Sequence, residues 1–109
     1  MSSEPGLDRH EWESELQALE PDLRDTPGEA LPELADLIQR MLLERGFDLD
    51  DTVAREGEER EVVAEYLAAR EISDLVERGD SAAGPGDVAS AINGLRAIFD
   101  FIVAERSGP

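Results

Sequence analysis

The side chains of this sequence that could do chemistry are almost all carboxylates. The 109 residues include 27 Asp and Glu against 10 Arg and no Lys, which gives a formal net charge of −17. Cysteine is absent and His10 is the single histidine, so disulfide scaffolds, thiolate metal sites and thiol nucleophiles are excluded, as is Ser–His–Asp catalysis built on any imidazole other than His10. We also expect no direct binding to nucleic acid, because an anionic chain would have to approach an anionic backbone.

Acidic pairs spaced three residues apart are the pattern closest to a catalytic site. The paired motifs that hold Mg²⁺ in all-α nucleotide pyrophosphatases of the MazG type are similar to two pairs here, Glu58-x-x-Glu61 and Glu71-x-x-Asp74. That chemistry needs the two motifs on adjacent antiparallel helices, so that their oxygens converge on the cations. Here both fall on one predicted helix, where residues 61 and 71 lie about 15 Å apart at 1.5 Å per residue. We therefore predict no metal, no cofactor and no enzymatic activity, with a Mg²⁺-dependent nucleotide hydrolase as the alternative.

The densest group of carboxylates, named the acidic segment below, is Glu56, Glu58, Glu59, Glu61 and Glu65. It predicts a docking surface for a basic protein partner, whose association the negative charge would accelerate. The competing interpretation is a solvated helix face crossed by ion pairs between residues four apart, since Arg55 and Arg60 are interleaved with the acids. The absence of Lys also fits high-GC coding or adaptation to high salt, and either would make part of the charge a property of the organism.

Helical periodicity runs through the chain, and no stretch alternates apolar and polar residues for long enough to predict a strand. Asp8 is placed as the N-cap of the first helix, and Pro21 as its stop signal. Thr26 and Pro27 open the second helix, and Gly46 ends it as a left-handed residue. We predict an all-α, single-domain, four-helix up-and-down bundle over residues 1–109, with short flexible termini at 1–6 and 107–109. Its helices are expected at about 8–20, 27–45, 51–78 (with a break near Gly57) and 86–106.

Two apolar stripes are expected to form the core. The second helix carries Leu31, Leu34, Leu37, Ile38, Met41 and Leu42 on one face, and the last helix carries Val88, Ile92, Leu95, Ile98, Phe99 and Ile102.

A second face of the last helix is made of small and apolar residues, Gly94, Ala97, Phe101 and Ala104. A mid-helix glycine costs about 1 kcal/mol relative to alanine, so Gly94 predicts a close approach of another backbone segment. Phe101 lies off the main stripe and would be exposed on an isolated helix. This face therefore predicts an apolar interface with a second copy or a partner helix, and packing between two neighbouring helices of the same chain is the competing interpretation.

Apolar runs are too short for a membrane span, and the first residues have neither the basic nor the apolar stretch of a secretory signal, so a cytoplasmic location is expected. Taken together, the patterns predict a small acidic, non-enzymatic interaction protein that acts as a regulator, adaptor or inhibitor of a basic protein partner. In this interpretation the acidic segment accelerates association and the apolar face supplies affinity. A purely structural homodimer, kept in solution by its charge, is the remaining alternative.

Overall fold

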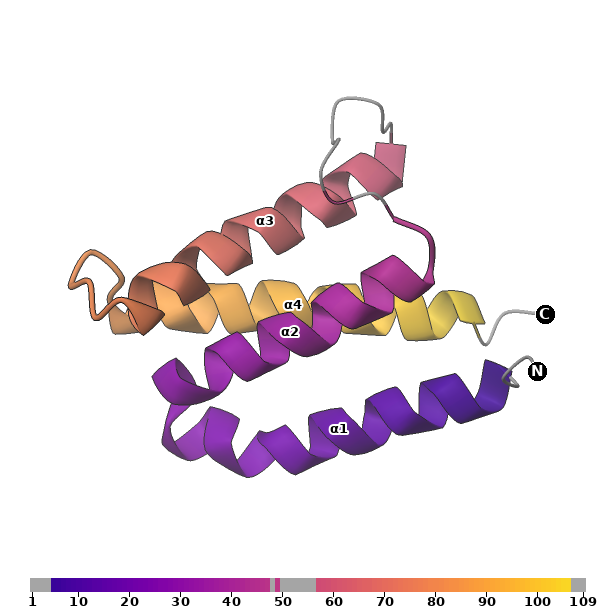
Figure 1. Ribbon diagram of the computed structural model, residues 1–109, viewed down its shortest axis with the longest axis horizontal. Coiled ribbons are helices and arrows are strands. Elements are labelled where there is room, and N and C mark those ends of the chain that lie inside the picture. Colours follow the sequence, from indigo (N-terminus) through magenta and orange to yellow (C-terminus); the bar gives the residue numbers. More distant parts are fainter. Residues whose placement is uncertain (1–4, 48, 50–56, 107–109) are drawn as a thin grey trace.

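The apolar stripe predicted for residues 31–42 lies at the centre of a bundle of four helices. The structure is a computed structural model that describes residues 5–47, 49 and 57–106. Its helices are α1 (Pro5–Asp25), α2 (Pro27–Glu44), α3 (Gly57–Glu77) and α4 (Pro85–Arg106). The α1–α2 turn and the α3–α4 loop lie at one end of the bundle, and the first turn of α1 and the last turn of α4 lie at the other (Figure 1). The predicted all-α four-helix bundle is thus confirmed.

Helix α2 is central because its apolar residues recur on one broad face. It packs against α1, α3 and α4, and α1 and α3 lie on opposite sides of it (Figure 1). All six predicted core residues of α2 are at most 1 % exposed: Leu31, Leu34, Leu37, Ile38, Met41 and Leu42. Burying each such side chain stabilises the fold by about 1.5–3 kcal/mol. The six predicted stripe residues of α4 are also buried, so both predicted core stripes are confirmed.

Helix α1 is longer at both ends than the sequence indicated. It begins at Pro5 and not after Asp8, since proline suits a first helical turn, so residues 5 and 6 are helical and were wrongly assigned to a flexible terminus. It also runs through Pro21 to Asp25, so the predicted stop is wrong. An interior proline costs about 3 kcal/mol. Leu23, just beyond it, is only 6 % exposed, and burying that side chain offsets much of the cost.

The two ends of α2 follow the predicted signals with one difference. Thr26 precedes α2 and its carbonyl accepts hydrogen bonds from the Glu29 and Ala30 amides, but its hydroxyl does not cap α2 and instead donates to the Asp22 carbonyl at 3.4 Å. At the other end Gly46 has a φ of +89° and the Phe47 amide donates to the Leu42 carbonyl at 2.9 Å. This is the left-handed helix end that was predicted.

The predicted break near Gly57 coincides with the first residue of α3, and residues 51–56 of the predicted third helix lie outside the described residues. The last helix begins at Pro85, one residue before its predicted start. None of the four helices, over the residues described, is long and apolar enough to cross a membrane.

Three arginines form ion pairs with acidic residues of neighbouring helices. Arg40 of α2 donates to both carboxylate oxygens of Glu15 of α1, at 2.6 and 3.1 Å. Arg96 of α4 does the same with Glu20 of α1, at 2.8 Å to each oxygen. Arg70 of α3 reaches α2, where it donates to Asp36 and Gln39 at 2.9 Å. Two of the three pairs are bidentate, the geometry that makes an arginine–carboxylate pair specific.

Candidate functional site

Two residues of the acidic segment, Glu61 and Glu65, and two of the apolar face of α4, Ala97 and Phe101, line one groove between α3 and α4. This groove has a volume of about 240 Å³ and is lined by two acids and four apolar residues, Glu61, Val62, Glu65, Ala97, Ile98 and Phe101. The acids and Val62 come from the first half of α3, and the other three residues come from the second half of α4. Two surfaces that the sequence predicted separately therefore each contribute residues to a single feature, named the α3–α4 groove below.

Gly94 determines how one of these acids lies on the bundle. A Cβ atom built on Gly94 would be 3.0 Å from Cδ and 3.2 Å from Cγ of Glu65, and closer still to a carboxylate oxygen. The missing side chain thus leaves a notch in α4, in which the Glu65 side chain rests. The sequence predicted a close backbone approach at Gly94, but the atoms nearest to it belong to the side chain of Glu65 on α3.

The remaining predicted site residues divide between those at the groove and those away from it. Glu61, Glu65 and Ala97 are exposed. Phe101 is half-buried and packs against the core, so the bundle itself covers part of this ring. Ala104 is exposed but does not line the groove. Glu56 lies outside the described residues, as do the side chains of Glu58 and Glu59.

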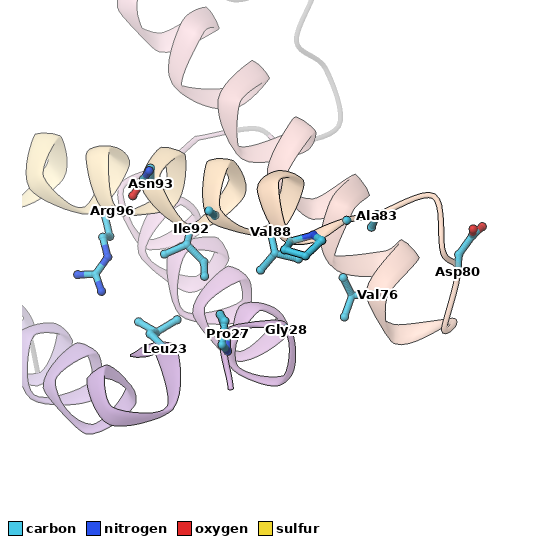
Figure 2. A pocket seen from close by; sticks show the side chains of 13 residues that line it. Leu23, Pro27, Gly28, Val76, Asp80, Ala83, Val88, Ile92, Asn93 and Arg96 are labelled. Carbon is cyan, nitrogen blue, oxygen red and sulfur yellow. The ribbon is translucent and has the colours of Figure 1, made fainter. Parts of the chain in front are cut away.

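A second hollow, named the end cleft below, lies where the α1–α2 turn meets the α3–α4 loop (Figure 2). Its volume is about 640 Å³. Most of its lining is aliphatic or small, and it draws on all four helices: Leu23, Pro27, Gly28, Val76, Ala83, Gly84, Pro85, Val88, Ala89 and Ile92, with the polar residues Asp80, Asn93 and Arg96. Sequence reasoning missed this cleft, because the residues that form it are far apart in the chain. The one local signal was the small residues around Pro27 and Pro85 at the starts of α2 and α4.

The ion pair between Arg96 and Glu20 borders the end cleft. Hydrogen bonds from Arg96 lower the pKa of Glu20 below its ordinary value of 4.5, and the same bonds raise the pKa of Arg96. Both side chains are about one-third exposed, so solvent screens part of this interaction. The pair places a guanidinium held by two hydrogen bonds at the wall of a largely apolar space.

Other acidic side chains lie in a separate groove between α2 and α3, where Glu29, Glu33, Asp36 and Glu77 are found. Asp36 accepts a hydrogen bond from Arg70 there. Among the described residues, no three Asp, Glu or His side chains gather closely enough to hold a metal ion. His10 is exposed on α1.

The α3–α4 groove and the end cleft differ in the size of ligand that they suit. Small-molecule pockets occupy roughly 300–1,000 Å³; the groove, at about 240 Å³, falls below that range, and the cleft, at about 640 Å³, falls within it. Comparisons of the chain with protein family models, with curated proteins and with solved structures give no match. A function must therefore be inferred from the dimensions and the lining residues of these two hollows.

Proposed function

We propose that the protein is a small acidic interaction protein that docks a basic, amphipathic segment of a protein partner in the α3–α4 groove. The observation that carries this proposal is the position of Glu61 and Glu65 beside the apolar residues Val62, Ala97 and Phe101. Such a surface offers carboxylates and an apolar hollow within one helix-to-helix groove. It suits a partner helix that has large apolar side chains on one face and Lys or Arg beside them.

The apolar part of the groove would supply most of the affinity. A volume of about 240 Å³ has room for large side chains of a partner. Each leucine-sized side chain that leaves water gains about 1.5–3 kcal/mol, before the cost of association. Ala97 is exposed and keeps the groove open, and the half-buried Phe101 gives it a firm aromatic wall.

The charge of the chain would supply speed and selectivity. The net charge is −17, and Arg40, Arg70 and Arg96 are already engaged with acids of neighbouring helices. The carboxylates at the groove therefore act in a strongly negative field. Such a field accelerates encounter with a cationic partner and disfavours an anionic one, and salt weakens it.

Calorimetric titration with a synthetic amphipathic helical peptide of leucine and lysine tests the proposal. The wild type should bind it, and a leucine–glutamate peptide of the same pattern should not bind. Glu61→Gln combined with Glu65→Gln should weaken binding roughly three- to tenfold and reduce its salt dependence. The matched control is Glu71→Gln combined with Glu77→Gln, which removes the same charge from exposed positions of α3 outside the groove.

Two results would overturn the proposal. An equal loss of affinity in the control pair would show that net charge, and not the groove, attracts the peptide. The second result has two parts. The wild-type protein would fail to bind the peptide and would sediment as a dimer, and the Phe101→Asp variant would sediment as a monomer. That result would assign the same face to a homodimer, the alternative that the sequence left open.

A further inference from the structure

The end cleft has the walls of a ligand site, and its position separates it from the α3–α4 groove. Leu23 of α1, Val76 of α3 and Ile92 of α4 face a common space (Figure 2). Leu23 and Ile92 belong to the core but keep 6–7 % of their surface exposed, whereas the central residues of α2 keep at most 1 %. The core is thus closed around α2, and Leu23 and Ile92 leave a small part of their apolar surface accessible at this end of the bundle.

Glycines keep the cleft open where packing would have allowed a side chain. A Cβ on Gly84 would meet no atom within 4 Å, and one on Gly28 would meet only Val76, at an ordinary 3.9 Å. Neither glycine has a positive φ, since Gly46 and Gly79 are the glycines of the described chain that do. Backbone strain and close approach therefore explain neither residue. Together with Ala83 and Ala89, these glycines line the end cleft without filling its volume of about 640 Å³.

Arg96 gives the cleft a directional polar group. Its guanidinium extends from α4 towards the Leu23 side of the cleft (Figure 2), and its two terminal nitrogens each donate one hydrogen bond to Glu20. These two bonds fix the orientation of the group but use only part of its N–H donors. An acceptor atom on a bound molecule would use one of the donors that Glu20 does not engage.

From these features we propose that the end cleft binds an uncharged, largely apolar small molecule that carries a hydrogen-bond acceptor. Its apolar body would lie against Leu23, Val76 and Ile92, and its acceptor would meet Arg96. This site goes beyond the docking of a basic partner and does not depend on it.

Charge considerations select an uncharged ligand over an ionic one. Glu20 already neutralises Arg96 at 2.8 Å, so an anion would have to displace it against a net charge of −17. A cation would need an acid that faces the cleft. The carboxylate of Asp80 points away from the aliphatic walls (Figure 2) and accepts a hydrogen bond from the Ala82 amide at 2.9 Å.

Fluorescence titration with Nile red, an uncharged dye with a carbonyl acceptor, tests this site in the full chain. The wild type should show saturable binding with enhanced emission. Ala89→Trp should abolish it, because residue 89 is exposed and lines the cleft, so an indole there fills the space without entering the core. The matched control is Ala97→Trp, at an exposed alanine of the same helix that lines the α3–α4 groove, and it should bind the dye as the wild type does.

A second variant tests the polar contact. Arg96→Met should weaken dye binding roughly five- to tenfold through loss of one hydrogen bond, whereas Glu20→Gln, which loosens the guanidinium but keeps its donors, should weaken binding less. The proposal would be overturned if the wild type showed no saturable dye binding. It would also be overturned if Ala89→Trp, with an unchanged thermal midpoint, bound the dye as tightly as the wild type does. A loss of dye binding in Ala97→Trp but not in Ala89→Trp would also overturn it, because the dye would then bind in the α3–α4 groove. Peptide binding that survives Ala89→Trp while dye binding is lost would show that the two sites stand independently.

Discussion

The side chain of Glu65 on α3 rests in the notch that Gly94 leaves in α4, with its Cδ atom 3.0 Å from the point that a Cβ on residue 94 would occupy. This relationship joins the acidic segment to the apolar face of α4, because it holds a carboxylate next to Ala97 and Phe101. A glycine in the middle of a helix is otherwise unfavourable by about 1 kcal/mol relative to alanine. The notch therefore gives a physical reason for a residue that helix propensity disfavours.

Gly94→Ala should raise the stability of the bundle and lower the affinity of the groove for the peptide. The side chain of Glu65 is exposed, so it has room to rotate away from the new methyl group. The free energy of unfolding should then rise by about 0.5–1 kcal/mol through helix propensity, measured by urea denaturation. Affinity for the leucine–lysine peptide should fall, because the carboxylate leaves its position beside the apolar residues.

The control for this change is Gly86→Ala in the same helix, where an added Cβ meets no atom within 4 Å. It should leave peptide affinity unchanged. In a Glu65→Ala background, Gly94→Ala should no longer alter affinity, since the displaced carboxylate is already absent. Equal peptide affinity for Gly94→Ala and the wild type would contradict the role assigned to the notch.

Replacing Ser73 with alanine should stabilise the fold. Its side chain is fully buried on α3, and within the described part of the chain its hydroxyl oxygen has no hydrogen-bond partner. A buried hydroxyl without a partner costs about 1–3 kcal/mol, so Ser73→Ala should raise the free energy of unfolding by about 1 kcal/mol or more. Ser90→Ala, at an exposed site on α4, reports the gain from helix propensity alone. A smaller gain for Ser73→Ala than for Ser90→Ala would show that the hydroxyl has a stabilising partner.

Acid should remove the contribution of the Glu20–Arg96 pair. Because hydrogen bonds from Arg96 lower the pKa of Glu20 below 4.5 in the folded state, the unfolded chain takes up the proton first as pH falls. The pair therefore stabilises the fold above pH 4.5, and this contribution is lost as pH falls through the lowered pKa. Glu20→Gln should cost up to about 1 kcal/mol at pH 7 for this partly exposed pair. Urea denaturation should show the two proteins converging in strongly acidic solution, and a difference that stays constant with pH would contradict this assignment.

The parts of the fold that could be predicted are those set by residues close together in the chain. The apolar spacing of residues 31–42 identifies the buried face of α2, and Gly46 ends that helix as a left-handed residue. The end of α1 could not be predicted in this way. Pro21 is a valid local stop signal, and it is overridden because Leu23 gains burial from helices that lie elsewhere in the sequence.

The candidate sites show the same limit. Helical periodicity identified Phe101 as a residue off the main stripe of α4, but it could not show that the bundle itself half-covers this ring. Nor could it show that Glu65, which is 29 residues before Gly94 in the sequence, fills the notch there. The end cleft depends on the relative placement of Leu23, Val76 and Ile92. Only the packing of helices brings these three residues to one space.

The most direct test of partner docking is an NMR titration of the isotope-labelled protein with the leucine–lysine peptide. Saturable shifts of backbone amides should concentrate at Val62, Glu65, Ala97 and Phe101, and should weaken as salt is added. Shifts spread evenly over the acidic residues of all four helices would contradict the account, because they would show attraction by charge without a site. Shifts confined to Leu23, Val76 and Ala89 would contradict it equally, since they would place the peptide in the end cleft.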